Sequence, residues 1–175
     1  MKKFYLILLL TSYLYAKEHI ILPLSKTLPE LKTIDKYAIT IPGGKNIIYV
    51  FVDPFCHYSQ DFIKRAISPE NNLIKSYTYK VFLLKLNKFE SASTIKSILS
   101  SKDKYKALTN FMVNHEKIVS GNTNSKDVEK IIEKVSIIGN NLDIYKRPYM
   151  IIEYEGWEED EDDFGDFDDE EDEDE

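Results

Sequence analysis

Hydrophobic and polar positions along this chain repeat with two different periods, which predict strands and helices in alternation. Residues 37–41 alternate and are β-branched, and residues 46–52 form an almost wholly apolar run. A short, continuous run of this kind is typical of a strand that is buried on both faces. The sequence PGGK between these two stretches predicts a turn. Residues 77–86 and 149–154 are the other two predicted strands.

Four helices are predicted where apolar residues recur three or four positions apart. The first begins near His57 and ends at the Ser-Pro pair at 68–69. Ser100 followed by Asp103 predicts the start of the third helix, and Gly139 predicts the C-terminal cap of the fourth. In chain order, the apolar faces consist of Phe62, Ile63, Ala66 and Ile67; of Ile95, Ile98 and Leu99; of Tyr105, Leu108, Phe111 and Met112; and of Val128, Ile131, Ile132 and Val135.

The order of these elements predicts the fold class. Two strands, a helix, a strand, three helices and a last strand are typical of an α/β layer fold with a partly parallel sheet. The length of 175 residues suits one domain, which we expect at residues 36–156. Residues 17–35 contain Pro23 and Pro29 and are expected to form a lead-in linker, mostly loop with one short helical turn.

The first sixteen residues predict a secretory signal peptide. Lys2 and Lys3 precede a short apolar run, and Ala16 is a small residue at a plausible cleavage point, although Leu14 departs from the usual small residue. The run is shorter than the roughly 20 residues that span a bilayer. We therefore expect export to a bacterial periplasm, which is oxidising, with no integral membrane span after signal cleavage. An uncleaved anchor or a buried strand is the alternative.

Charge is distributed very unevenly along the chain. Residues 153–175 hold 17 of the 30 acidic residues and no Lys or Arg, whereas residues 1–152 carry 23 basic and 13 acidic residues, a formal net charge of +10. A basic body raises the question of nucleic acid binding. No nucleic-acid motif accompanies it and export argues against it, so we expect no nucleic acid partner.

The acidic C-terminus cannot bury a core, and its charges repel one another. We therefore expect residues 157–175 to be a disordered, solvated tail. Two functional interpretations stay open. The tail could fold back on the basic body, with Trp157, Phe164 and Phe167 as apolar anchors, or its carboxylates could bind Ca²⁺ weakly. Its spacing lacks an EF-hand pattern.

Cys56 is the only cysteine in the chain, and it lies where a predicted apolar strand meets a predicted helix, within VFVDPFCHYSQDF. Unpaired amides and the helix dipole favour a thiolate at such a position. His57, if protonated, would add to this effect. Ser59 stands three positions after Cys56, where a second cysteine would complete a redox motif. A lone cysteine is also often just a small, buried apolar residue.

Three stretches resemble one known family. IIYVFVDPFCHYSQDFIKRAI is similar to the active-site strand and helix of thioredoxin-fold proteins, most of all the catalytic domain of Dsb-type periplasmic disulfide isomerases. ILSSKDKYKAL resembles that family's helical insert, and RPYMII resembles its loop before a strand, where a cis-proline faces the cysteine. The residues that match around the cysteine are Phe51, Asp53, Pro54, Cys56 and Tyr58; Pro148 would be the cis-proline.

The resemblance implies a thioredoxin-like fold with a helical insert, and the departures from it are equally specific. Ser59 replaces the second cysteine, and Arg147 replaces the usual Thr before the proline. The family's last hairpin strand and closing helix have no counterpart before the acidic residues. We therefore expect a fold that is truncated at its C-terminus.

The activity implied by the resemblance is thiol–disulfide exchange. We predict Cys56 as the nucleophile with His57 and Ser59 beside it, and substrate binding by Tyr58 together with the Arg147-Pro148 loop. Ser59 cannot release a mixed disulfide, so an outside thiol is needed, from a cysteine-containing exported protein or a small thiol. The alternative is a non-catalytic binding or assembly protein that interacts through its acidic tail.

No cofactor or metal is expected. His19 and His115 have no neighbours at the spacing of metal ligands.

Overall fold

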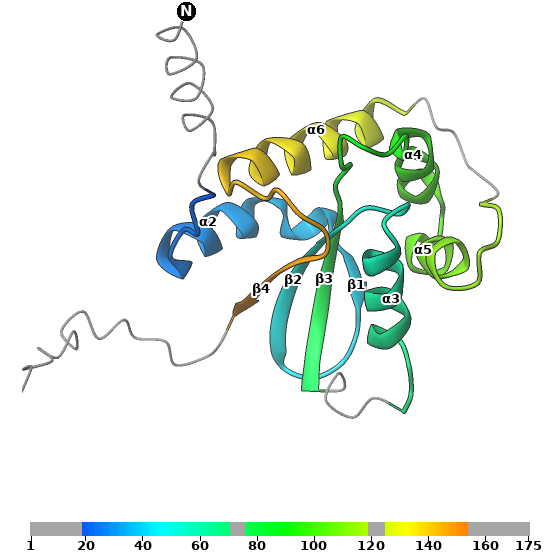
Figure 1. Ribbon diagram of the computed structural model, residues 1–175, viewed down its shortest axis with the longest axis horizontal. Coiled ribbons are helices and arrows are strands. Elements are labelled where there is room, and N and C mark those ends of the chain that lie inside the picture. The colour runs from blue at the N-terminus through cyan, green and yellow to red at the C-terminus, as the bar shows by residue number, and fades with distance from the viewer. Residues whose placement is uncertain (1–18, 71–75, 119–124, 154–175) are drawn as a thin grey trace, which may run out of the picture.

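The computed structural model describes residues 19–70, 76–118 and 125–153 (Figure 1). The predicted signal peptide at 1–16 and the predicted tail at 157–175 lie outside these residues, as does most of the linker between the third and fourth predicted helices. The expectations about those segments therefore stay predictions.

A four-stranded sheet forms the centre of the structure. Its strands are β1 (Ile39–Ile41), β2 (Asn46–Val52), β3 (Tyr77–Leu83) and β4 (Tyr149–Glu153), in the order β1-β3-β2-β4. β2 and β3 run parallel and pair residue for residue along their whole lengths, whereas β1 and β4 are antiparallel to their neighbours. The predicted, partly parallel sheet is confirmed, and β2 has the predicted bounds.

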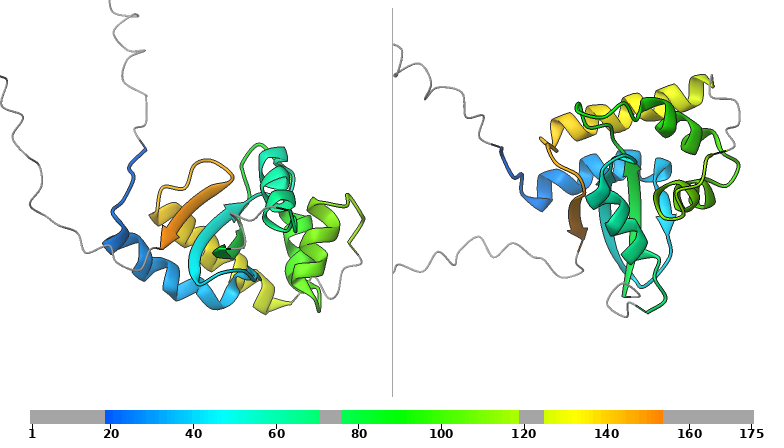
Figure 2. Two further views of the ribbon diagram at one scale, coloured as in Figure 1. Left: turned by 90° about the horizontal axis from the view of Figure 1, so that it is seen from below. Right: turned by 45° about the vertical axis from the view of Figure 1, so that its right-hand side comes forward.

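Helices cover both faces of this sheet (Figures 1 and 2). α3 (His57–Ala66), α4 (Ala92–Ser100) and α5 (Lys104–Met112) pack with the β2 residues Ile48, Val50 and Val52. On the other face, α2 (Leu24–Ile34) and α6 (Lys126–Asn141) pack with Tyr49 and Phe51. β2 therefore presents apolar side chains to two separate cores, which is why its sequence is continuously apolar rather than alternating.

The expectation of a mostly irregular segment before the first strand is wrong. Residues 24–34 form an 11-residue helix that contains Pro29, and a short 3₁₀ turn, η2 (Asp35–Tyr37), follows it. Proline within a helix removes a backbone hydrogen bond, which is why the sequence predicted loop. Burial offsets this cost, because Leu31 and Ile34 are 0% and 1% exposed in the core under α2.

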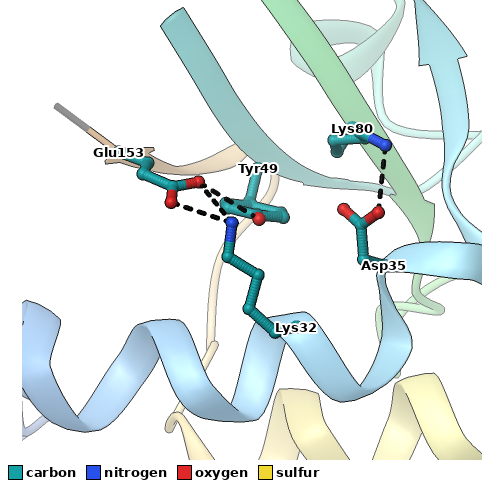
Figure 3. Close-up of polar contacts among 5 residues, drawn as sticks. All are labelled: Lys32, Asp35, Tyr49, Lys80 and Glu153. Carbon is teal, nitrogen blue, oxygen red and sulfur yellow. Dashed lines mark hydrogen bonds and ion pairs between the residues drawn. The ribbon is translucent and has the colours of Figure 1, made fainter. Parts of the chain in front are cut away.

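Polar contacts also join α2 and η2 to the sheet (Figure 3). Lys32 Nζ donates to both carboxylate oxygens of Glu153 at 2.8 and 2.9 Å, and the Tyr49 hydroxyl donates to Glu153 Oε2 at 3.3 Å. The hydrogen bonding of Lys32 with Glu153 first, and with Tyr49 second, raises the pKa of Lys32 above its usual range. Lys80 Nζ donates to Asp35 Oδ2 at 3.0 Å. Glu153 is the last residue of β4, so the Lys32–Glu153 contact links this strand to α2.

Two predicted helix signals are wrong. Gly139 does not cap α6, because the helix continues to Asn141 with Leu142 as its C-cap. A side chain at Gly139 would overlap that of Leu84, so glycine allows α6 to approach the segment after β3 closely. At the start of α5, Asp103 itself is the N-cap, and its carboxylate accepts the Lys106 amide at 2.9 Å. Ser100 belongs to α4 instead.

Two further expectations need smaller corrections. The first strand begins at Ile39 rather than at residue 37, because η2 occupies residues 35–37, and β3 ends at Leu83 rather than at residue 86. On α5, Tyr105 is 38% exposed, and Ala107 is buried in its place.

Across residues 19–70, 76–118 and 125–153, the structure contains no helix with the length and apolar character needed to cross a membrane.

Candidate functional site

Cys56 caps the N-terminus of α3, as the sequence predicts. β2 ends at Val52, four residues turn the chain, and the ten-residue helix starts at His57. The Cys56 amide donates to Asp53 O, and its carbonyl accepts from the Gln60 amide, both at 3.0 Å. The side chain therefore lies where unpaired amides and the helix dipole favour a negative charge.

The loop before β4 faces this cysteine. The Arg147–Pro148 peptide bond is cis, as the resemblance implies. Cys56 Sγ donates to the Arg147 carbonyl at 3.6 Å, across 91 positions of sequence. Cys56 is only 3% exposed, so the residue is almost wholly buried.

Ser59 makes its side-chain contact with the turn that follows β2 and not with the sulfur. Its side chain is buried, and its hydroxyl accepts the Asp53 amide at 3.3 Å. The structure therefore gives the Ser59 hydroxyl a role in holding the turn between β2 and α3.

The two residues between Cys56 and Ser59 face solvent. His57 and Tyr58 are exposed, and their ring centroids lie 3.8 Å apart. Tyr58 is 64% exposed, which leaves its ring free to contact a bound molecule.

An open groove of about 410 Å³ lies between α3 and the cis-proline loop. The three predicted substrate-binding residues, Tyr58, Arg147 and Pro148, all line this groove. Asp61, Phe62 and Arg65 line it as well, and the sequence analysis missed them as groove residues. Their spacing from Tyr58 places them on one face of α3. This spacing can be read from the sequence. Phe62, however, was predicted to face the core, and it does pack against the core as well as lining the groove.

Arg147 is buried, which its predicted role at a binding surface did not suggest. It is 8% exposed, and its Nε donates to Leu84 O at 3.1 Å. Its Nη1 donates to the carbonyls of Ile144 at 3.1 Å and Lys146 at 2.8 Å. Burial lowers the pKa of this guanidinium to about 10, while Asp53 and then Cys56 act in the opposite direction.

Asp53, which matches the family's residues around the cysteine, is a second buried charged residue of the site. It is 0% exposed. One carboxylate oxygen accepts the Phe55 amide at 2.8 Å, and the other accepts the Leu86 amide at 2.6 Å and the Ser91 hydroxyl at 2.8 Å. This carboxylate joins the turn before α3 to the segment after β3.

The described part of the chain holds no group of three or more His, Cys, Asp or Glu residues placed to bind a metal ion.

Comparisons with known proteins find similarity at the level of structure. No protein-family model matches the sequence, and no curated protein matches it significantly. A crystal structure of Proteus mirabilis ScsC in a compact conformation aligns with a TM-score of 0.58 at 14% identity, over 86% of each chain. A disulfide interchange protein from Neisseria gonorrhoeae aligns with a TM-score of 0.54 at 18% identity, over 67% of this chain and 80% of that one. Helicobacter pylori DsbG aligns with a TM-score of 0.52 at 17% identity, over 73% of this chain and 62% of that one.

These likenesses define the fold. The chain has a thioredoxin-like α/β fold, with the helices α4, α5 and α6 inserted between β3 and β4. Identities this low establish the architecture and leave the chemistry to be argued from the site itself.

Proposed function

We propose that this chain is an exported, thioredoxin-like protein that carries out thiol–disulfide exchange with a single thiol, Cys56. The observation that carries the proposal is the 3.6 Å contact between the Cys56 sulfur, at the N-cap of α3, and the carbonyl before cis-Pro148. The N-cap position favours a thiolate, and the carbonyl contact supports the proposal that the cis-proline loop beside the sulfur faces the substrate. The similar structures are of proteins described as disulfide interchange and thiol-disulfide exchange proteins.

The reaction balances without an added oxidant or reductant. The thiol of Cys56 loses its proton to solvent, and the thiolate attacks one sulfur of a substrate disulfide. The substrate S–S bond breaks, a mixed disulfide forms with Cys56, and the second substrate sulfur leaves as a thiolate that solvent protonates. An alcohol does not exchange with a disulfide, so Ser59 cannot complete the cycle.

Release therefore requires a thiol from another molecule. Attack by a further cysteine of the same exported substrate on the substrate sulfur of the mixed disulfide frees Cys56 and gives isomerisation. With small thiols two steps are needed: the first thiol attacks the Cys56 sulfur and releases the reduced substrate, and the second frees Cys56 and leaves as a disulfide of the two small thiols. We propose cysteine-containing exported proteins and small thiols as the partners, with His57 beside the thiolate and with Tyr58, Arg147 and Pro148 along the substrate groove.

The rate of mixed-disulfide formation tests this proposal. The native protein and the same protein in urea are incubated at pH 7 with the neutral reagent 4,4′-dithiodipyridine, and the released thiopyridone is followed. We expect the native rate to exceed the denatured rate by up to about tenfold, because the helix N-terminus favours the thiolate that attacks the reagent. A native rate equal to or below the denatured rate would refute thiolate activation. Cys56→Ala is the control and should release nothing.

Two observations favour a second candidate function, a non-catalytic scaffold for binding or assembly. Cys56 is 3% exposed, and the Ser59 hydroxyl is bonded to the backbone instead of to the sulfur. Both features are equally compatible with a cysteine that only fills space. Trapping of mixed disulfides from a periplasmic extract distinguishes the two functions. The exchange function requires disulfide-linked adducts with the wild type and none with Cys56→Ala, and the scaffold function requires none with either.

A further inference from the structure

An apolar groove of about 360 Å³ lies between the start of α2 and the strand β4, and it shares no residue with the groove of the candidate exchange site. Residues 21–24 form one wall, and residues 149–152 of β4 form the other. None of the residues that line the groove is charged. Ile21 is 82% exposed and Met150 is 50% exposed, so large apolar side chains face solvent here. Contiguous apolar surface of this kind is typical of a binding site.

The groove follows the free edge of β4 rather than one face of the sheet. β4 pairs with β2 on one side, and among residues 19–70, 76–118 and 125–153 no strand pairs with its other side (Figure 1). Successive side chains of a strand point to opposite faces of the sheet, yet four consecutive residues of β4 line the groove. The groove therefore lies along the edge, where an extended segment of chain can bind.

Hydrogen bonds hold the wall on the α2 side in place. The Ile20 amide donates to Asp143 Oδ2 at 3.2 Å. The Thr27 hydroxyl donates to the carbonyls of Leu22 at 3.3 Å and Pro23 at 2.9 Å. The groove is thus already formed, and a bound segment does not have to order its wall.

The chain that continues from β4 has a composition that suits this groove. Trp157, Phe164 and Phe167 follow Glu153, and residues 154–175 hold 16 acidic side chains. The aromatic rings match the apolar lining, and the carboxylates are attracted to residues 1–152, whose formal net charge is +10. A second copy of the chain fits less well, because adjoining β4 strands would bring two such acidic segments together.

The connection from β4 is long enough for all three aromatic residues. An extended chain spans about 3.3 Å per residue, so Trp157, four residues after Glu153, can lie up to about 13 Å from it. This reach matches the length of β4 from Tyr149 to Glu153, and Phe164 and Phe167 can reach farther. Covalent attachment also gives the segment an effective concentration on the order of millimolar, so that even a weak contact is populated.

We propose that the groove between α2 and the edge of β4 binds the aromatic residues of the same chain's acidic C-terminus, with Trp157 as the nearest anchor and Phe164 and Phe167 beyond it. The bound segment covers the free edge of β4 and keeps its carboxylates next to the basic body. Folding back of the C-terminus, one of the two interpretations of these residues, thereby gains a defined surface. The inference goes beyond the exchange reaction and does not depend on Cys56.

Trp157 is the only tryptophan in the chain, and its fluorescence tests the inference in the full-length protein. We expect its emission at shorter wavelength, and its quenching by acrylamide at least about twofold weaker, in the native protein than in urea, because a docked ring is shielded from water. Ile21→Ser combined with Met150→Ser removes apolar contacts from the groove. This groove variant should bring the native quenching close to the value in urea.

The matched control is Ile20→Ser combined with Ile137→Ser, which removes two exposed apolar side chains that do not line the groove. It should leave the quenching unchanged, and circular dichroism verifies the folding of each variant. If the groove variant does not fold, Phe164→Ser combined with Phe167→Ser decides, because these residues lie outside the described part of the chain. Loss of these two anchors weakens docking and should raise the quenching of Trp157, whereas unchanged quenching overturns the inference.

Three other results would also overturn the inference. The first is native quenching equal to that in urea, and the second is an equal effect of the groove and control variants. The third is a dependence of emission on protein concentration together with a dimer by light scattering, which would assign the groove to a second copy. Cys56→Ala should behave as the wild type in this test, so failure here leaves the exchange proposal intact, and an absence of mixed disulfides leaves this inference intact.

Discussion

Ser59 occupies a buried position three residues after Cys56, at the start of α3. The Asp53 amide donates to its hydroxyl at 3.3 Å, at the junction between β2 and the turn. A side chain at this position lies on the same first turn of α3 as the cysteine. Ser59 differs from cysteine only in having an oxygen where cysteine has a sulfur. Exchange of this oxygen for sulfur would therefore complete a dithiol motif at a position that is already buried in the fold.

Replacement of that atom gives the first prediction. Ser59→Cys should allow a second sulfur to attack a mixed disulfide at Cys56, which an alcohol cannot do. We expect the variant to reduce insulin in the presence of dithiothreitol faster than the wild type, by about tenfold or more, as measured by turbidity. The control is Ser59→Cys combined with Cys56→Ala, which should be inactive. A folded single variant with wild-type activity would show that this scaffold does not support dithiol chemistry.

Gly44 and Gly139 each lie close to another segment of the chain, and we expect their replacement by alanine to destabilise the protein to different extents. A Cβ at Gly44 would overlap the backbone carbonyl of Ser76, whereas a Cβ at Gly139 would meet the end of the Leu84 side chain. Backbone cannot move aside as a leucine methyl can.

We therefore expect Gly44→Ala to lower the free energy of unfolding by about 2–3 kcal/mol. For Gly139→Ala we expect a change within about 1 kcal/mol, because the higher helix propensity of alanine offsets part of the crowding. Urea denaturation measures both values. A larger loss at Gly139 than at Gly44 would contradict this ranking.

At the scale of elements, α2 is a helix whose local signals are weak and which tertiary contacts support. It contains Pro29, and its N-cap residue, Pro23, makes no capping hydrogen bond through its side chain. Leu31 and Ile34 enter the core formed with β2 and α6, and Lys32 reaches Glu153 at the end of β4. Apolar burial and an ion pair thus act on the same helix.

A comparison of neighbouring substitutions separates these two contributions. Leu31→Ala should destabilise the protein by about 2–5 kcal/mol, because it removes a fully buried side chain. Lys32→Met should cost at most about 1 kcal/mol, because the Lys32 and Glu153 side chains are 49% and 25% exposed and water screens the pair. Thermal unfolding of both variants measures the difference. The reverse order would show that the ion pair, and not burial, holds α2.

At the scale of the whole molecule, the chain carries a net charge of −7 although residues 1–152 are basic. Residues 158–175 hold 15 acidic side chains, so their removal changes the net charge from −7 to +8. A change in net charge of this size alters the electrostatic potential around the protein, and with it the rate at which charged reagents reach the protein. The effect extends over distances comparable to the Debye length.

We expect a variant that ends at Trp157 to react faster with the anionic disulfide 5,5′-dithiobis(2-nitrobenzoic acid) than the full chain does. The gain should be about tenfold at 10 mM salt and should largely vanish at 1 M salt. The neutral reagent 4,4′-dithiodipyridine is the matched control and should show no such gain. Equal gains with both reagents would mean that residues 158–175 affect access to Cys56 rather than the field.

Much of the fold was predictable because its signals are local. The apolar run at β2, the helical spacing in α3 to α6 and the cysteine before a helix each lie within a few neighbouring residues. The cis-proline loop was predicted by the resemblance of a short stretch, and the cis bond at Pro148 agrees with it. Cys56 at the N-cap of α3 and the cis bond before Pro148 therefore agree with the sequence, and the roles of both residues stay predictions.

Other features depended on residues far apart in the chain. Pro29 and Gly139 are helix breakers by local rules, yet both lie inside helices, because α2 is buried against the sheet and α6 must approach Leu84 closely. The sequence placed Arg147 at a binding surface, but its partners include a carbonyl 63 positions away. Such pairings follow from which elements pack together.

The sequence by itself determined the strands, most of the helices and the presence of one thiol at a helix N-terminus, because periodicity and capping are properties of neighbouring residues. Only the tertiary structure decided the environment of that thiol. It brought the carbonyl of Arg147 to the sulfur of Cys56 and buried a cation and an anion beside it. The physical reason is that burial and long-range hydrogen bonds arise when distant segments pack, and these set the electrostatics of the site.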